Sequence, residues 1–485
     1  MYACESIWFQ KEQRRKKLYK IVGGYGGIGL LIVVLVVCIF FLVTGFFHKV
    51  PEKHSLLQEE TLTQNINGSQ EMEEPMQSNE ESAGFTEGEW TEEDFYVEED
   101  DEDASEVPLI VIDPGHGGMD EGCSREGEEE KAYNLELALM LKSSLEEEGF
   151  RVLLTRTEDT EVSLTERVQC SVLAKADLFI SIHQNASEYP EAEGIETWYC
   201  TDSSGDNKRL ASLVQKYVIQ NTETKNRGIQ ETGDLYVIRE CGIPACLVET
   251  GFLSNDNDFE KLKSEEYRKK IVKGLTEAVW YYYNPKKMYL TFDDGPSKEN
   301  TVRILEVLKE RNIQATFFVV GENVEKYPDI IKRMVEEGHS IGIHCYSHAY
   351  EDIYQSVEGF VADFEKAKEA VQNIVEVEVW CYRFPGGSIN SHNKYIYEDI
   401  IAEMSEMGYV YYDWNASMED ALKNATKEQI IQNAVESTLK RKKVVMLGHD
   451  IMYNTSVCME ELIDSFPEYE FLPLTKEVTP VQFKQ

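Results

Sequence analysis

One segment near the start of the chain is long, apolar and uncharged, and it constrains the fold more than any other feature. Residues 21–47 contain no charged side chain, and only glycines, Tyr25 and Thr44 interrupt the apolar residues. This run of 27 residues exceeds the roughly 20 residues that span a bilayer as a helix. Residues 1–20 hold a cluster of lysines and arginines, which favours a cytoplasmic N-terminus. We therefore expect a cytoplasmic basic segment, one transmembrane helix over residues 21–47, and all later domains outside the cell.

A cleaved signal peptide is the alternative for this segment. The apolar region of a signal peptide has about 7–15 residues and is followed by small residues at the cleavage site. The run here is longer, and residues 44–47 read Thr-Gly-Phe-Phe, which is a poor cleavage site. An uncleaved membrane anchor is therefore the prediction.

The 485-residue chain has a net charge of −41, and much of that charge lies in one stretch. Residues 51–107 contain 20 acidic residues, one lysine and no apolar period. Such a composition cannot bury enough apolar surface to fold, so residues 48–107 are expected to form an acidic disordered linker. A nucleic-acid partner is disfavoured, because phosphate backbones are bound by basic surfaces.

From residue 108 onward, short apolar runs alternate with helical patterns. This alternation predicts α/β sheets that are covered by helices on both faces, and we expect the sheet of the first domain to be mixed. A four-residue junction at 284–287, Asn-Pro-Lys-Lys, divides the pattern into a domain over residues 108–283 and a domain over residues 287–475. The clearest expected strands are residues 109–112, 151–155, 178–182, 245–249, 288–292, 315–320, 340–343, 410–412 and 444–447.

Four candidate site residues stand out in the first domain. His116 and His183 each follow an expected strand, Glu130 precedes a helix, and Glu249 ends a strand. Ligands bind where strand ends converge in open α/β sheets. Two histidines and a carboxylate, with one position left to water, are typical of a catalytic zinc site, and a further carboxylate could carry the proton to a leaving amine. Taken singly, each could equally be a hydrogen-bonded loop residue or part of a solvated charge run.

Three motifs of this domain occur in order over about 140 residues: Asp-Pro-Gly-His-Gly-Gly, Ser-Ile-His-Gln-Asn and Val-Glu-Thr-Gly-Phe-Leu-Ser-Asn. Together they resemble the zinc-dependent N-acetylmuramoyl-L-alanine amidases of the amidase-3 family, over residues 108–283. The resemblance implies hydrolysis of the amide between the lactyl group of muramic acid and the L-alanine of the stem peptide. It implies that His116, Glu130 and His183 hold Zn²⁺. Glu249 would be the catalytic carboxylate.

A second set of polar residues lies in the second domain. Asp293 and Asp294 are adjacent and follow a strand, and neighbouring carboxylates repel each other unless a cation or water separates them. His344 and His348 are four residues apart, which suits chelation of one metal ion. Arg383 can clamp a carboxylate. Read singly, Asp-Asp-Gly is also a turn, and the histidine spacing also occurs by chance.

These motifs, with Asp413-Trp414 and Leu447-Gly448-His449-Asp450 at later strand ends, resemble the polysaccharide deacetylases of the NodB-homology type over residues 287–475. The resemblance implies a distorted (β/α) barrel that uses a divalent metal, Zn²⁺ or a similar ion. The implied metal ligands are Asp294, His344 and His348. The implied catalytic residues are Asp293 as the base, Arg383 to orient it, His449 as the acid and Asp413 to tune His449. Trp414 and Leu447 would form the wall of the acetyl pocket.

Together these patterns predict a membrane-anchored, bifunctional enzyme that modifies peptidoglycan on the cell-wall side of the membrane. Its partners would be glycan strands, stem peptides and the membrane. Two alternatives remain: a deacetylase that acts on another N-acetylated polysaccharide, or a wall-binding scaffold with inactive sites. The spacing of Cys345 and Cys381 leaves open whether they pair.

Overall fold

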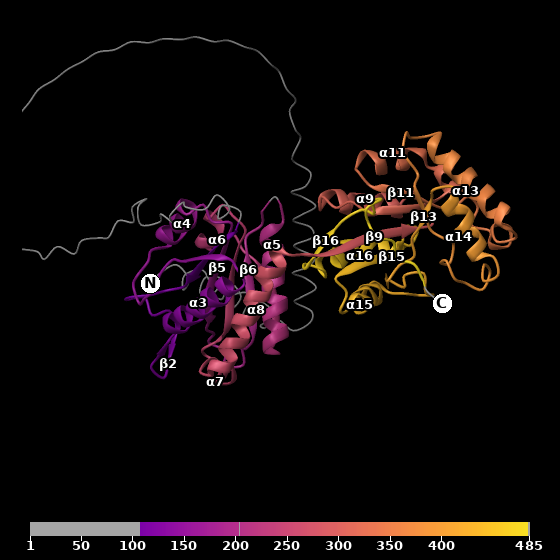
Figure 1. Ribbon diagram of the computed structural model, residues 1–485. Coiled ribbons are helices and arrows are strands. Elements are labelled where there is room, and N and C mark those ends of the chain that lie inside the picture. Colours follow the sequence, from indigo (N-terminus) through magenta and orange to yellow (C-terminus); the bar gives the residue numbers. More distant parts are fainter. Residues whose placement is uncertain (1–106, 203, 484–485) are drawn as a thin grey trace, which may run out of the picture. The chain divides into compact units, whose positions relative to one another are not determined.

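The computed structural model describes residues 107–202 and 204–483 (Figure 1). The predicted transmembrane helix over residues 21–47 and nearly all of the predicted linker lie outside these residues. Within the described part, every helix is too short or too polar to cross a membrane.

The first domain is built on a six-stranded mixed sheet in the order β4-β1-β5-β8-β6-β7. The strands β4, β1, β5 and β8 are parallel to one another, and β6 is antiparallel to β8. The prediction of an α/β sheet is confirmed, and the antiparallel β6 makes it mixed. The strands are β1 (Leu109–Pro114), β4 (Arg151–Leu154), β5 (Leu178–Asn185), β6 (Ile195–Tyr199), β7 (Asn226–Glu231) and β8 (Ala245–Phe252).

Successive side chains of a strand point to opposite faces of the sheet. Helices pack against both faces, so both are buried. In β1, Ile110 and Ile112 join an apolar cluster with residues of α3, α5 and α8. Val111 joins a second cluster with residues of α4 and α6. The helices are α3 (Glu130–Glu147), α4 (Leu164–Leu173), α5 (Asp206–Thr222), α6 (Tyr236–Glu240), α7 (Asp256–Leu262) and α8 (Glu265–Tyr283), and a small hairpin joins β2 (Ser124–Arg125) to β3 (Glu128–Glu129).

The second domain has an eight-stranded, all-parallel sheet in the order β13-β12-β11-β10-β9-β15-β14, with β16 also paired to β9. Among the described strands, β13 and β14 are not paired with each other. The sheet is therefore a curled half-barrel, an open form of the distorted (β/α) barrel that we expected. The strands are β9 (Lys286–Asp293), β10 (Thr316–Val320), β11 (Ser340–Cys345), β12 (Cys381–Tyr382), β13 (Val410–Tyr411), β14 (Ala416–Ser417), β15 (Lys443–His449) and β16 (Tyr469–Phe471).

Helices cover the outer face of the half-barrel, and one apolar cluster joins them to the strands. Alternate strand residues, among them Tyr289 and Phe318, form a smaller cluster on the opposite face. The helices are α9 (Asn300–Glu310), α10 (Gly321–Lys326), α11 (Pro328–Glu336), α12 (Tyr350–Ile353), α13 (Val357–Gln372), α14 (Tyr397–Glu406), α15 (Lys427–Thr438) and α16 (Tyr453–Asp464).

The chain passes directly from one domain to the other. Helix α8 ends at Tyr283 and β9 begins at Lys286, so only Asn284 and Pro285 lie between them. All eight cysteines of the described residues are free thiols, including Cys345 and Cys381.

Candidate metal centres

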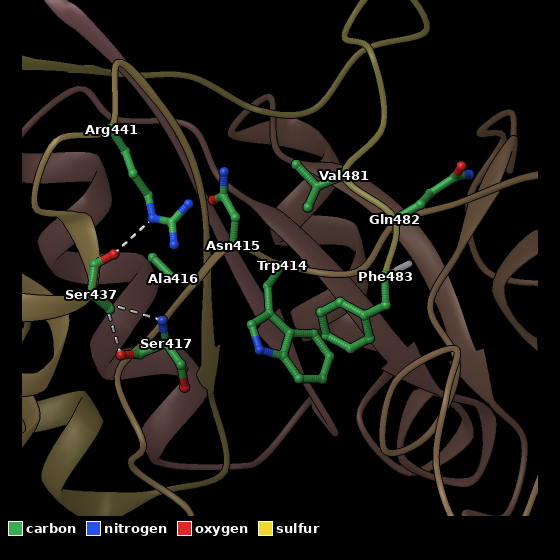
Figure 2. Close-up of a pocket in the computed structure, with 9 residues that line it drawn as sticks. All are labelled: Trp414, Asn415, Ala416, Ser417, Ser437, Arg441, Val481, Gln482 and Phe483. Atoms are coloured by element: carbon green, nitrogen blue, oxygen red, sulfur yellow. Dashed lines mark hydrogen bonds between the residues drawn. The ribbon is translucent and has the colours of Figure 1, made fainter. Parts of the chain in front are cut away.

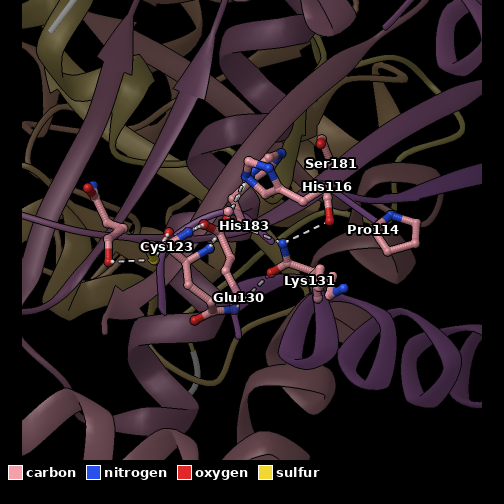
Figure 3. A network of polar contacts seen from close by, with 12 residues as sticks. Pro114, His116, Cys123, Glu130, Lys131, Ser181 and His183 are labelled. Carbon is pink, nitrogen blue, oxygen red and sulfur yellow. Dashed lines mark hydrogen bonds and ion pairs between the residues drawn. The ribbon is translucent and has the colours of Figure 1, made fainter. Parts of the chain in front are cut away.

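The first domain gathers His116, Glu130 and His183 into one cluster (Figure 3). Nε2 of His116 lies 3.2 Å from Oε1 of Glu130, and Nδ1 of His183 lies 3.1 Å from the same oxygen. His116 lies in the loop after β1, Glu130 begins α3, and His183 lies near the end of β5. The ligand atoms lie within 4.8 Å of one another, so they could surround a single ion.

Two buried arginines hold the backbone that carries His116. Arg156 donates from Nε to the carbonyl of Pro114 at 3.0 Å and from Nη2 to that of Gly115 at 3.0 Å. Arg167 donates to the carbonyls of Pro114, at 2.7 Å, and His116, at 2.8 Å. Gly115 leaves room for His183, because a Cβ at this position would lie 2.1 Å from the imidazole ring. The loop after β1 is therefore built to present His116 to the cluster.

The chemistry of these three residues fits a zinc ion. Nδ1 of His116 is 2.8 Å from Asp120, and such a second partner orients a metal-binding imidazole. Burial would lower the pKa of His116, but Glu130 and Asp120 raise it to about 9. Burial would raise the pKa of Glu130, but His116 and His183 hold it well below its usual range. The carboxylate is therefore ionised and faces two imidazoles, which is the donor set of a catalytic zinc site.

Glu249 lies beside this cluster on β8. It is in register with His183 of β5 on one side and with Glu196 of β6 on the other. Its Oε2 is inaccessible to solvent and makes no hydrogen bond to any described residue. Burial raises the pKa of Glu249 well above its usual range, and the charges of Glu130 and Glu196 raise it further. This carboxyl group therefore binds a proton readily and has an oxygen free to pass it on.

Glu196 is a polar residue near Glu249 that the sequence did not single out. Its Oε1 accepts a hydrogen bond from Asn185 at 2.9 Å, and its Oε2 pairs with Nε of Arg227 at 2.6 Å. Glu196 was missed because it lies in none of the three motifs, although the β-branched and aromatic residues of β6 favour a strand.

The second domain gathers Asp294, His344 and His348 into a similar cluster. Oδ1 of Asp294 lies 3.3 Å from Nε2 of each histidine. His344 donates from Nδ1 to the carbonyl of Arg383 at 2.9 Å, which leaves its Nε2 free to face Asp294. Asp294 and His348 both have positive φ angles, 77° and 58°, and this tight backbone turns their side chains toward each other.

This second cluster also fits a metal ion. Oδ1 of Asp294 is buried and makes no hydrogen bond to any described residue. Burial would raise the pKa of Asp294, but the two histidines lower it far below its usual range. The nearby carboxylate of Asp294 raises the pKa of His348. An ionised oxygen without a hydrogen-bond donor, placed between two imidazole nitrogens, is what a divalent cation requires.

Arg383 orients the neighbouring Asp293. The guanidinium is fully buried and donates from Nη1 to Oδ1 of Asp293 at 2.9 Å and to Thr291 at 2.7 Å. Its other nitrogens donate to the carbonyls of Tyr412, at 2.8 Å, and Asp413, at 3.1 Å. Because each guanidinium nitrogen of Arg383 donates a hydrogen bond, the arginine is held in place and fixes Asp293 at the end of β9, beside Asp294.

The structure corrects the expected partner of His449. The carboxylate of Asp420, not that of Asp413, lies 2.8 Å from Nδ1 of His449. Asp420 also accepts a hydrogen bond from Thr455 at 2.6 Å. Burial would lower the pKa of His449, but Asp420 raises it to about 9. The side chain of Asp413 instead accepts hydrogen bonds from Ser388.

Sheet order gives the physical reason for this correction. Asp413 follows β13 at one edge of the sheet, whereas His449 ends β15 near the other edge. Asp420 follows β14, which pairs directly with β15. The sequence could have revealed Asp420 only if the two-residue strand β14 had been recognised.

Trp414 lies beside Arg383, whose guanidinium carbon is 5.7 Å from the centroid of the Trp414 ring. Trp414 lines a cavity of about 510 Å³ together with Ser417, Arg441 and Phe483 (Figure 2). None of the residues that line this cavity is a candidate metal ligand, Asp293 or His449. Leu447 is buried in β15, in register with Thr291 of β9.

Comparison with known proteins agrees with the two-domain division. Residues 110–281 match the N-acetylmuramoyl-L-alanine amidase family, and residues 282–412 match the polysaccharide deacetylase family. N-acetylmuramoyl-L-alanine amidase LytC of Bacillus subtilis is 39% identical over 175 residues, which is 36% of this chain and 35% of LytC. The chain thus spans about a third of the length of that relative.

Two further relatives are matched over most of their length. N-acetylmuramoyl-L-alanine amidase CwlM of Bacillus licheniformis is 36% identical over 180 residues, or 37% of this chain and 70% of CwlM. A peptidoglycan-N-acetylglucosamine deacetylase of Bacillus cereus is 32% identical over 193 residues, or 38% of this chain and 68% of that protein. The chain therefore belongs to the N-acetylmuramoyl-L-alanine amidase family through its first domain and to the polysaccharide deacetylase family through its second, and both are families of hydrolases that act on amide bonds.

Proposed function

We propose that this chain is a bifunctional peptidoglycan hydrolase. The first domain, over residues 108–283, cleaves the amide between the lactyl group of muramic acid and L-alanine. The second domain, over residues 287–475, removes N-acetyl groups from an amino sugar of the same polymer. One observation carries the proposal: each domain presents two histidines and a carboxylate where its parallel strands end, with a separate carboxyl group beside them.

The two centres share one kind of chemistry. A bound divalent metal, Zn²⁺ in the first centre and Zn²⁺ or a similar ion in the second, would lower the pKa of a water molecule and polarise the substrate carbonyl. His116, Glu130 and His183 would hold the first ion. Asp294, His344 and His348 would hold the second ion.

In the first domain, Glu249 moves the proton. Its unpartnered Oε2 takes a proton from the attacking water and delivers it to the departing nitrogen of L-alanine. The raised pKa of Glu249 lets the carboxyl group hold that proton between the two steps.

In the second domain, two residues carry out the proton transfers. Asp293, fixed by Arg383, is the base that accepts the proton of the attacking water. His449 is the acid, and because its Nδ1 faces Asp420, it donates from Nε2 to the departing amine. Asp420 keeps the imidazole protonated by raising its pKa to about 9.

The location of the substrate indicates on which side of the membrane the catalytic domains lie. Peptidoglycan lies outside the membrane, so both catalytic domains belong on the cell-wall side. Residues 21–47 would anchor the chain in the membrane, with residues 1–20 in the cytoplasm and residues 48–107 as an acidic linker.

Mass spectrometry of muropeptides tests the proposal directly. Cell-wall peptidoglycan is digested with the metal-loaded wild type, with Glu249→Gln and with Asp293→Asn. The wild type should yield glycan that lacks both stem peptides and some acetyl groups. Glu249→Gln should leave the peptides attached, and Asp293→Asn should leave the acetyl groups in place. Wild-type protein that changes neither bond would contradict the proposal and favour a wall-binding scaffold.

A further inference from the structure

A row of aromatic rings leads from the second metal centre to the protein surface. The ring of His348 contacts that of Tyr350 edge-on, with centroids 5.2 Å apart and an interplanar angle of 83°. Tyr350 in turn stacks on His392, with centroids 4.8 Å apart and an angle of 30°. Tyr350 is half-buried, whereas His392 is exposed. The mechanism proposed above uses neither Tyr350 nor His392.

The loop that carries His392 is held in place. Oδ1 of Asn390 accepts the backbone N–H of His392 at 2.8 Å, and Nδ2 of Asn390 donates to the carbonyl of Pro385 at 3.1 Å. The buried side chain of Asn393 donates to the carbonyl of Gly387 at 3.2 Å. The ring of His392 is therefore positioned before any ligand arrives, which reduces the entropy lost on binding.

We propose that Tyr350 and His392 form a sugar-binding subsite of the deacetylase. The inference rests on the proposed function of the second domain. The outer face of His392 receives the apolar C–H face of a pyranose ring in the glycan chain. This sugar neighbours the one whose acetamido group lies at Asp294, His344 and His348. Tyr350 supports the imidazole from behind and sets its distance from the metal ligands.

Three observations favour a sugar over a purely structural role for these rings. Flat rings bury much area at a well-defined geometry, and His392 is an exposed residue. The row starts at the metal ligand His348, so these rings form one of the walls along which a glycan bound at the metal can extend. Binding sites for small molecules commonly combine aromatic walls with a few polar groups, and here the metal cluster supplies the polar part.

The test uses the metal-loaded whole chain and a peptide-free glycan hexamer of alternating N-acetylglucosamine and N-acetylmuramic acid. Calorimetry measures its Kd for the wild type, His392→Ala, His392→Phe and Tyr395→Ala. Tyr395 is the matched control, because it lies in the same loop and is 82% exposed, with its ring against Lys394. Circular dichroism verifies that each variant is folded.

We expect His392→Ala to weaken hexamer binding by about three- to tenfold, the size of a lost ring contact. His392→Phe should restore binding, because it keeps a flat ring, and Tyr395→Ala should bind as the wild type does. In acetate release from the hexamer, His392→Ala should raise KM by a similar factor while kcat stays the same.

Unchanged hexamer binding in His392→Ala would overturn the inference. Equal weakening in Tyr395→Ala, or no rescue by His392→Phe, would overturn it as well. A wild type that binds the hexamer but releases no acetate would instead contradict the proposed deacetylase function. In that case the hexamer Kd values of the variants still show whether His392 binds the glycan. A failure of the subsite proposal can therefore be told apart from a failure of the proposed deacetylase function.

Discussion

At the scale of single residues, the partner of His449 shows how closely a side-chain role depends on strand order. Asp413 and Asp420 are seven positions apart and both follow short strands. Only Asp420 lies next to β15, and only its carboxylate reaches His449. Motif order predicted His449 as the acid but could not say which aspartate the fold would bring to it.

This assignment predicts a pH effect. Asp420 raises the pKa of His449 to about 9, and the proposed mechanism of deacetylation requires the protonated imidazole as the acid. Asp420→Asn removes the charge that favours the protonated form, so the pKa of His449 should fall. The alkaline limb of the kcat profile for acetate release should therefore move to lower pH.

Asp413→Asn is the control for that experiment. It can lower the overall rate, because Asp413 holds Ser388, but it should leave the position of the alkaline limb unchanged. A shift in Asp413→Asn without a shift in Asp420→Asn would restore the assignment expected from sequence.

A second prediction at this scale concerns Glu249. Glu249→Gln should slow peptide release by at least about 10²-fold, the lower range for a general acid–base group. It should retain its metal, because Glu249 is not among the three clustered ligand residues. Metal analysis of the purified protein, alongside peptide release, measures both effects.

His116→Ala provides the comparison for Glu249→Gln, because it removes a proposed ligand and should lose the metal of the first centre. Loss of metal from Glu249→Gln to the same extent would place Glu249 in the ligand set.

At the scale of elements, short apolar runs predicted most inner strands of each sheet and also the edge strands β4 and β13. Strands β5 and β8 read as continuous apolar runs, as expected in the middle of a parallel sheet. The short β14 and the mixed β6, which contains Glu196 and Trp198, gave no such signal. The polar residues missed at the two sites, Glu196 and Asp420, lie on or just after these two strands.

The loop after β1 supports a prediction about the first metal centre. Arg156 donates hydrogen bonds to the carbonyls of Pro114, Gly115 and Lys131, and the single ammonium group of a lysine cannot match that fork. Arg156→Lys should weaken zinc binding in the first centre by about 10- to 100-fold, as loss of an outer-shell partner commonly does. A chelator competition titration measures the affinity.

Metal binding in the second domain is the internal reference for Arg156→Lys and should not change. Arg239→Lys is a matched surface control, because Arg239 pairs with Glu240 in solvent and such pairs contribute little. Equal zinc affinity in Arg156→Lys and the wild type would show that the carbonyl contacts do not position His116.

At the scale of the whole molecule, the motifs predicted both domains, because each family places its polar residues at fixed strand ends. The predicted anchor and linker rest on composition alone, since they lie outside the described residues. Composition can identify an apolar span or an acidic stretch, but it cannot provide a contact by which either would be fixed to the catalytic domains.

Because both domains are proposed to act on the same polymer, we expect peptide removal to precede deacetylation. Peptide removal leaves a carboxylate on the lactyl group of muramic acid, and deacetylation of that sugar leaves an amine nearby, where closure to a lactam is favoured by proximity. We expect the deacetylase to prefer peptide-free muramic acid. Asp293→Asn should still strip peptides, whereas Glu249→Gln should deacetylate intact wall slowly, as followed by mass spectrometry.

If Glu249→Gln deacetylates fully peptide-substituted wall as fast as the wild type, the order is absent. The two domains would then act independently, and N-acetylglucosamine would be the better candidate substrate.

The free cysteines have a consequence for how such a chain matures. Seven of the eight are buried, and burial raises the pKa of Cys170 to about 12 and that of Cys458 to about 11. Thiols that remain protonated react slowly with oxidants and disulfides. Because the described cysteines form no disulfide in the folded domains, reductants should not slow the refolding of these domains.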